Sequence, residues 1–292
     1  MEKTNRTFIR QHRPEWLKVR APGGETYSEL KTLMRTRSLH TVCEEARCPN
    51  IGECWNSGTA TFMILGDVCT RNCRFCVVTS GRPMPPDPME PKNVAESIRH
   101  MKLQHAVITS VDRDDLPDGG STHWANVINE ARRLNPHTTI EVLVPDFQGN
   151  LDQLHTVLEA KPEILNHNIE TVPHLYARVR PKAVYADSLA LLLDAKMQGF
   201  TTKSGMMVGI GEKDEEVIES MQDLRKSIVD ILTIGQYLQP TPKHLPVDRF
   251  VHPDTFEYFK KCGMEMGFMV VESGPLVRSS YHADRAAKLT KV

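Results

Sequence analysis

The stretch that decides the fold is residues 59–76, which read TATFMILGDVCTRNCRFC. Its first seven residues are all β-branched or apolar, so residues 59–65 are predicted to form a buried strand. Three cysteines follow directly, in the spacing C-x3-C-x2-C: Cys69, Cys73 and Cys76. In a barrel of parallel strands, the loops after the strands line the active-site mouth. The stretch therefore predicts three thiolates at a position where chemistry takes place.

Downstream of this stretch, strand-like runs alternate with helical runs. The predicted strands are 59–65, 106–111, 138–144, 164–169, 202–208, 231–237 and 268–271. The predicted helices are 91–103, 122–134, 150–160, 187–198, 214–227 and 254–266. Such alternation predicts an α/β fold of βαβ units with a parallel sheet. Six units are too few for a closed eight-stranded barrel and suit an open, partial (β/α)6 TIM-like barrel; a doubly wound sheet is the alternative.

Two regions lie outside this alternation. Residues 1–58 contain no convincing strand and form a predicted N-terminal extension, while residues 273–292 form a polar C-terminal tail. The barrel between them spans residues 59–272, and a proline-rich connector at 83–91 joins the cysteine loop to the first helix. We expect both extensions to cover the barrel mouth.

Composition excludes several classes of protein. The 292 residues include 36 Lys and Arg against 37 Asp and Glu, a formal net charge of −1. That balance argues against a partner that is nucleic acid or a membrane surface. The longest apolar runs are far shorter than a bilayer span, and the first twenty residues have no apolar core typical of a secretory signal. The sequence therefore predicts a cytoplasmic protein.

Cysteine usage points to metal binding. The chain has seven cysteines, an odd number, and six of them lie between residues 43 and 76. A long chain with clustered cysteines and no secretory signal favours metal ligation over disulfides. Three thiolates on a four-iron cluster would leave one iron open to a small molecule. A zinc loop, or three unrelated core cysteines, are the alternatives. Cys262 lies on an apolar helix face and is predicted to be a buried core thiol.

The C-x3-C-x2-C loop resembles the cluster loop of the radical S-adenosylmethionine (SAM) superfamily, including the aromatic Phe75 before its last cysteine. Residues 205–212 resemble that superfamily's G-x-I-x-G-x-x-E pattern, with Met207 in place of Ile. The resemblance implies SAM contacts from Phe75, Asn168, Glu170 and Met207. The loop at 112–120 lacks the glutamate of the superfamily's Gly-Gly-Glu motif, and most of its carboxylates are predicted to be solvated.

Further motifs resemble one family within that superfamily, the lipoyl synthases. They are Cys48-Pro49-Asn50, TSVDRDDL at 109–116, NHNIET at 166–171 and RSSY at 278–281. The resemblance implies that Cys69, Cys73 and Cys76 hold the catalytic 4Fe-4S cluster. It also implies a second, auxiliary 4Fe-4S cluster, with these ligands: Cys43, Cys48, Cys54 and Ser280. Oxygen is a poor match for iron sites of the thiolate type, which suits a cluster that must surrender sulfide.

The function that this resemblance implies is sulfur insertion. SAM, cleaved at the first cluster, would supply the radical that removes hydrogen from C6 and C8 of an octanoyl group. The auxiliary cluster would supply the sulfur. Implied partners are octanoylated lipoyl carrier domains (the E2 component of 2-oxoacid dehydrogenases or the glycine cleavage H protein), a ferredoxin or flavodoxin as electron donor, and an iron–sulfur carrier for cluster repair. The alternatives are a non-catalytic electron carrier or zinc module, a biotin-synthase-like enzyme and a methylthiotransferase.

Overall fold

The computed structural model describes residues 13–19, 23, 32, 40–41, 50–52, 61–280 and 283. Its main sheet has eight strands in the order β1-β2-β5-β6-β7-β8-β9-β10, and β1 pairs antiparallel with β2 while the rest are parallel. The strands are β1 (His40–Thr41), β2 (Thr61–Ile64), β5 (His105–Ser110), β6 (Thr139–Leu143), β7 (Ile164–Asn166), β8 (Thr201–Val208), β9 (Ile231–Gln236) and β10 (Val270–Gly274). Seven parallel strands in sequence order, with no pairing between the two ends of the sheet, make the predicted open, partial barrel.

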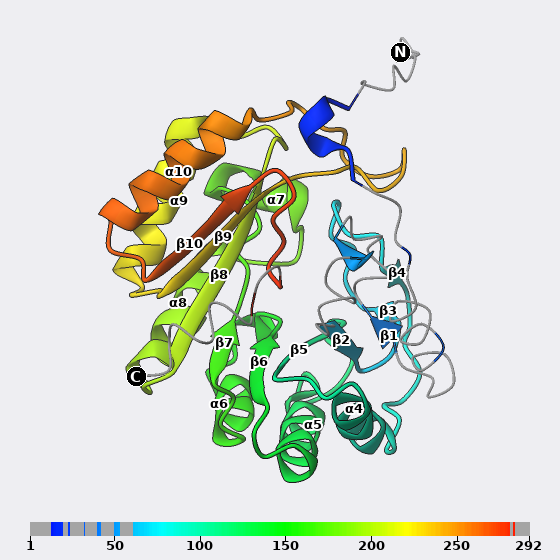
Figure 1. Ribbon diagram of the computed structural model, residues 1–292. Helices are drawn as coiled ribbons and strands as arrows, with labels where there is room; N and C mark the ends of the chain where they lie inside the picture. The colour runs from blue at the N-terminus through cyan, green and yellow to red at the C-terminus, as the bar shows by residue number, and fades with distance from the viewer. Residues whose placement is uncertain are drawn as a thin grey trace.

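Six helices follow the first six parallel strands and lie on the outer face of the curved sheet (Figure 1). They are α4 (Glu90–His100), α5 (Ser121–Leu134), α6 (Leu151–Glu159), α8 (Tyr185–Met197), α9 (Asp214–Lys226) and α10 (Pro253–Glu265). In α5, Trp124, Val127, Ile128 and Ala131 are buried at helical spacing and pack against strand residues such as Ala106 and Ile108. Every predicted strand and helix of the barrel is present, with boundaries that differ by a few residues.

Smaller elements went unpredicted. Between β7 and α8 lie η3 (Pro173–Leu175) and α7 (Tyr176–Val179), and η2 (Phe147–Gly149) precedes α6. The short strands β3 (Val68–Cys69) and β4 (Thr79–Ser80) pair in parallel around the cysteine loop. The expectation of no strand in residues 1–58 was wrong, because β1 pairs with β2 and extends the sheet. The strand has only two residues, which are too few to show a periodic pattern in the sequence. The turn η1 (Glu15–Leu17) packs through Trp16 onto His252, with ring centroids 5.1 Å apart.

The inner face of the sheet carries a buried ion pair. Ile140 and Val142 pack into the outer core, so Glu141 between them points to the barrel interior. There it bonds Lys203 Nζ at 2.9 Å, and Asn166 Nδ2 donates to the same carboxylate oxygen at 3.0 Å. Burial raises the pKa of Glu141, but Lys203 and His105 outweigh burial and hold it at about 2. The barrel interior is therefore polar below its mouth.

Candidate functional site

The three cysteines of the C-x3-C-x2-C loop lie at the carboxyl edge of the sheet, each of them half-buried. Cys69 ends β3, and its sulfur accepts the N–H groups of Arg71 and Asp112, both at 3.4 Å. A turn closed by Cys76 N donating to Cys73 O at 3.1 Å brings the last cysteine back. His244 caps the loop from the β9–α10 connection, 2.8 Å from the carbonyl oxygen of Cys76. The loop is thus held in place by hydrogen bonds to its backbone groups and to the Cys69 sulfur.

The chemistry of this donor set fits an iron–sulfur cluster. Burial, with Asp112 adding, raises the pKa of Cys69 and Cys73 to about 12; burial raises that of Cys76 to about 11. Thiols with such pKa values are neutral near pH 7, so a metal group must displace their protons when it binds. Among the described residues, no three His, Cys, Asp or Glu side chains are placed to hold a single metal ion. A four-iron cluster is larger than one ion and joins sulfurs that lie further apart.

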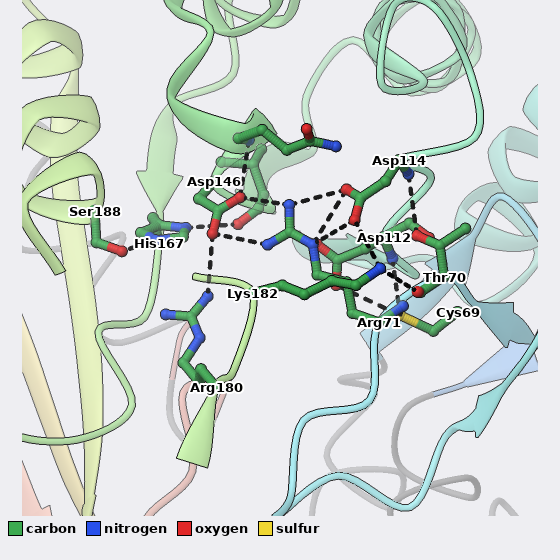
Figure 2. Close-up of polar contacts among 12 residues, drawn as sticks. Cys69, Thr70, Arg71, Asp112, Asp114, Asp146, His167, Arg180, Lys182 and Ser188 are labelled. Carbon is green, nitrogen blue, oxygen red and sulfur yellow. Dashed lines mark hydrogen bonds and ion pairs between the residues drawn. The ribbon is translucent and has the colours of Figure 1, made fainter. Parts of the chain in front are cut away.

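The carboxylates after β5 are not solvated as expected. Asp112 Oδ2 lies 3.5 Å from Cys69 Sγ, Asp112 Oδ1 lies 3.3 Å from Arg71 Nε, and burial raises the pKa of this carboxyl. Asp114 accepts from the same guanidinium at 2.9 Å (Figure 2). Asp118 caps α5 by accepting from Gly120 N and Thr122 N. Only Asp115 of the four is exposed, and it pairs with the buried Arg113. Asp112 and Asp114 are half-buried because both contact Arg71 of the cysteine loop, a partner that the sequence did not indicate.

Asn168 and Glu170 lie just beyond β7, and the structure brings them together. Asn168 Nδ2 donates to Glu170 Oε1 at 3.1 Å, while Asn168 Oδ1 is buried without a hydrogen-bond partner. Glu170 has a left-handed φ of 65° and bridges to Met206 of β8. Burial raises the pKa of Glu170, and Arg180 and Asn168 lower it in part. An orphaned acceptor beside a buried carboxyl fits a ligand with hydroxyl or amine donors.

The segment at 205–212 leaves space for Asn168 beside β8 and then forms the turn that follows this strand. A Cβ on Gly205 would lie 2.5 Å from Thr233 Oγ1 and 2.7 Å from Asn168 Oδ1, so glycine is required there. After β8, Glu212 accepts from Gly209 N and Ile210 N at 2.6 and 3.0 Å. Met207 and Phe75 are both half-buried against the core formed around β8, β9 and their helices. The resemblance-based residues therefore lie in or beside one wall of the barrel mouth.

Arg180 is a residue of this wall that sequence analysis missed. Its Nη1 donates to Asn168 O at 2.8 Å and to the Tyr176 hydroxyl at 3.1 Å, and its Nη2 lies 3.9 Å from Asp146. It follows α7, a four-residue helix too short to leave a periodic signal. A cavity of about 340 Å³ is lined by Arg71 and by residues of the loops after β5 and β6.

Asn50 of the N-terminal extension contacts the C-terminal segment that follows β10. Asn50, buried at 4% exposure, donates from Nδ2 to Leu276 O at 2.7 Å. The carbonyl oxygen of Val277 lies so close to Gly235 of β9 that a Cβ there would approach it to 2.1 Å. Ser279 and Ser280 follow and are half-buried. Cys43, Cys48 and Cys54 lie outside the described residues.

Cys262 is half-buried on α10, not fully buried as expected, and packs against the core around β8, β9 and α10. Its Tyr258 neighbour on the same helix shares a hydrogen bond with it. Within the described parts of the chain, no helix is both long and apolar enough to cross a bilayer.

Comparison with known proteins gives one consistent family. The sequence profile of the radical SAM superfamily matches residues 63–224, and that of the N-terminal domain of lipoyl synthase of the radical SAM family matches residues 1–48. A lipoyl synthase of Rubrobacter xylanophilus is 59% identical, covering 94% of this chain and 86% of that protein. One from Chlorobaculum tepidum is 53% identical, covering 96% and 97%.

Solved structures agree on the fold. Methylornithine synthase (PylB) matches with a TM-score of 0.50 at 15% identity, covering 90% of this chain and 88% of that one. SuiB of Streptococcus suis bound to S-adenosylmethionine matches with a TM-score of 0.58 at 12% identity, covering 85% and 61%. At these identities the similarity concerns the partial barrel alone.

Proposed function

The chain belongs to the lipoyl synthase family of radical SAM enzymes, and from that premise we propose which of its residues serve the reaction. Lipoyl synthases use SAM and 4Fe-4S clusters, one of them auxiliary, to insert two sulfur atoms at C6 and C8 of an octanoyl group on a lipoyl carrier protein. Cys69, Cys73 and Cys76 hold the cluster at which SAM is cleaved. The bound group supplies a radical, which is needed because such C–H bonds lack the acidity that a general base requires.

The wall of the barrel mouth takes the SAM molecule. Asn168 presents an acceptor without a protein partner, and Glu170 lies within hydrogen-bonding distance of the same amide. We assign both to polar groups of SAM, and Phe75 and Met207 to its apolar surfaces. Arg180 holds the Asn168 carbonyl and thereby orients the wall.

The auxiliary cluster belongs to the N-terminal extension, residues 1–58, with Cys43, Cys48, Cys54 and Ser280 as ligands. The observation that carries this assignment is the hydrogen bond from Asn50 to Leu276, which joins the extension to the tail, 273–292, four residues before Ser280. The partial barrel, residues 59–272, lies between them in sequence. Leu276 follows the carboxyl end of β10, so this contact brings Asn50 to the edge of the sheet where the first cysteine loop lies.

We further propose a cytoplasmic enzyme that receives electrons from a ferredoxin or flavodoxin. Six cysteines clustered in a long chain are typical of metal ligation rather than of disulfides, which supports a reducing compartment. The carrier substrate is an E2 component or a glycine cleavage H protein. Because the auxiliary cluster is consumed as sulfur donor, an iron–sulfur carrier must rebuild it.

The two cysteine sets should separate SAM cleavage from sulfur insertion. Alanine at any of Cys69, Cys73 or Cys76 should abolish 5′-deoxyadenosine formation, while alanine at Cys43, Cys48 or Cys54 should leave SAM cleavage and abolish sulfur in the product. Anaerobic reconstitution of the wild type should give about eight irons per chain, falling to about four in either set of variants. Deoxyadenosine from a variant of the first set would contradict the assignment.

Replacement of Ser280 tests the fourth auxiliary ligand. Ser280→Cys should give a more tightly held cluster that yields less thiolated product, because thiolate suits iron better than a serine oxygen does. Ser280→Ala should release one iron readily. Ser279→Ala is the matched control, since the neighbouring serine is also half-buried. Equal iron retention by the two alanine variants would require the fourth ligand to be sought elsewhere.

A further inference from the structure

Arg71 lies between the first two cysteines of the loop, yet its side chain points away from them toward a cluster of three carboxylates. The side chain is only 3% exposed. It bonds Asp114 with Nε and Nη2, both at 2.9 Å, and Asp146 Oδ2 with Nη1 at 2.8 Å (Figure 2). Asp112 Oδ1 adds a contact at 3.3 Å. Only the planar fork of a guanidinium can meet three carboxylates in this way.

The partners of Arg71 come from two other loops of the barrel mouth. Asp112 and Asp114 follow β5, whereas Asp146 follows β6 and starts η2. Thr70, which precedes Arg71, also joins the cysteine loop to the β5 loop. It donates to Asp112 O through N and Oγ1 at 3.0 and 2.9 Å. Among the described residues, the ion pairs between the cysteine loop and the β6 loop are those of Arg71 with Asp146.

Asp146 continues the network to the wall that we assign to SAM. Its second partner is Arg180, 3.9 Å away, and Arg180 Nη1 donates to the carbonyl oxygen of Asn168 at 2.8 Å. Burial raises the pKa of Asp146, but Arg71 outweighs burial and holds the pKa at about 2. One buried carboxylate thus stands between two arginines, one from each half of the site.

We propose that Arg71 is a positioning residue that sets the cysteine loop in place relative to the SAM-binding wall, through Asp146 and Arg180. The inference rests on the proposed roles of the three cysteines and of Asn168. Removing the guanidinium would leave three carboxylates close together and would free the loop from the β6 side. Breaking a buried ion pair in this way is strongly destabilising to its surroundings.

The first test uses the protein without metal and measures thiol exposure. In Arg71→Met, iodoacetamide should alkylate Cys69, Cys73 and Cys76 roughly tenfold faster than in the wild type, because the loop opens more often. Peptide mass spectrometry resolves each cysteine, and Cys262 on α10 serves as the internal reference. Lys196→Met is the matched control: it removes a half-buried cation that bonds both oxygens of Asp230 at 2.9 and 2.8 Å, at the amino end of β9. That variant should leave the loop thiols at their wild-type rate.

The second test uses the reconstituted protein at a temperature well below unfolding. In Arg71→Met and in Asp146→Asn, SAM should bind roughly ten- to hundredfold more weakly, with iron content and circular dichroism retained. The change that SAM induces in the electron paramagnetic resonance spectrum of the reduced cluster should shrink in parallel. Arg71→Lys keeps the charge without the fork, and should fall between the methionine variant and the wild type.

The outcomes separate this inference from the proposed function. Wild-type alkylation rates and wild-type SAM affinity in both Arg71→Met and Asp146→Asn would overturn the positioning role. A fall in thermal stability alone, with normal SAM affinity per folded molecule, would make Arg71 merely structural and would overturn it as well. Failure of the loaded wild-type protein to cleave SAM would instead refute the proposed function, and the alkylation result would still stand for the loop.

Discussion

Asn168 occupies a space that the neighbouring strand leaves open by using glycine. Gly205 of β8 faces it, and any side chain there would overlap the Asn168 amide or the Thr233 hydroxyl. The amide keeps one oxygen without a protein partner, while its nitrogen is committed to Glu170. Small residues beside an unsatisfied polar group mark a place where a ligand completes the hydrogen bonding.

Gly205→Ala should therefore weaken SAM binding more than it weakens the fold. The new Cβ, 2.7 Å from Asn168 Oδ1, pushes the amide out of its position. We expect a loss in SAM affinity of roughly tenfold or more, measured by isothermal titration under anaerobic conditions.

Gly263→Ala is the matched control for that variant, because a Cβ there would meet Val271 Cγ2 at 2.8 Å inside the α10 core. It should lower the melting temperature and leave SAM affinity unchanged. Equal SAM affinities in Gly205→Ala and the wild type would mean that Asn168 does not contact SAM.

At the scale of elements, the joint between β7 and α8 depends on one buried histidine. His167 bonds the Val144 carbonyl at 2.9 Å and Ser188 Oγ of α8 at 2.9 Å, and the Tyr176 hydroxyl of α7 reaches the same serine at 3.0 Å. The chain of contacts joins β6, β7, α7 and α8 behind the wall that we assign to SAM. The short helix α7, which the sequence did not predict, thus has a structural role despite its length.

His167 should make the joint sensitive to acid. Burial, together with Arg180, lowers its pKa to about 4, below its ordinary value of about 6.5. As pH falls from 6.5 toward 4, the unfolded chain takes up a proton at this position and the folded chain does not, so stability falls. The total loss is roughly 3 kcal/mol.

His167→Gln should remove this part of the pH dependence. Denaturant unfolding at pH 6.5 and pH 4.5 should show a smaller drop in unfolding free energy for the variant than for the wild type, even if the variant is less stable at both. Identical drops in the two proteins would exclude His167 as the source.

At the scale of the whole molecule, one hydrogen bond joins the N-terminal extension to the segment after β10. Asn50 from the N-terminal extension and Leu276 from the tail are 226 residues apart in sequence and share one hydrogen bond. Ile51 beside Asn50 is buried in the core around β2, α4 and α5. The extension is therefore anchored both to the barrel and to the tail that carries Ser280.

Asn50→Ala should loosen the auxiliary cluster selectively. The variant leaves the Leu276 carbonyl without its donor, which costs about 1–3 kcal/mol. We expect faster loss of iron from the auxiliary cluster, and sulfur insertion should fall while SAM cleavage continues. Iron release to a chelator, followed by absorbance, measures the first effect.

Asn135→Ala is the control, since Asn135 Nδ2 makes the same kind of bond, to Ala95 O at 2.9 Å, between α4 and α5. It should cost similar stability without faster iron release. Equal iron release from the two variants would contradict a specific tie between the chain ends.

The sequence alone was enough for the order of strands and helices, the open barrel and the position of the first cysteine loop. These features rest on local signals: apolar periodicity, helix capping, and spacing within a few residues. The motif at 205–212 was readable for the same reason. The family followed from motifs that are contiguous in sequence, and the comparisons confirmed it.

The surroundings of individual side chains were decided only by the tertiary structure. Asp112 and Asp114 look solvated in sequence, next to Arg113 and Asp115, yet their partner Arg71 lies 43 residues from Asp114 and 75 from Asp146. Lys203 and Glu141, 62 residues apart, likewise form a buried pair with no local pattern. The energy of a buried charge depends on which opposite charge the fold places beside it, and that placement follows from strand register and loop closure over long separations.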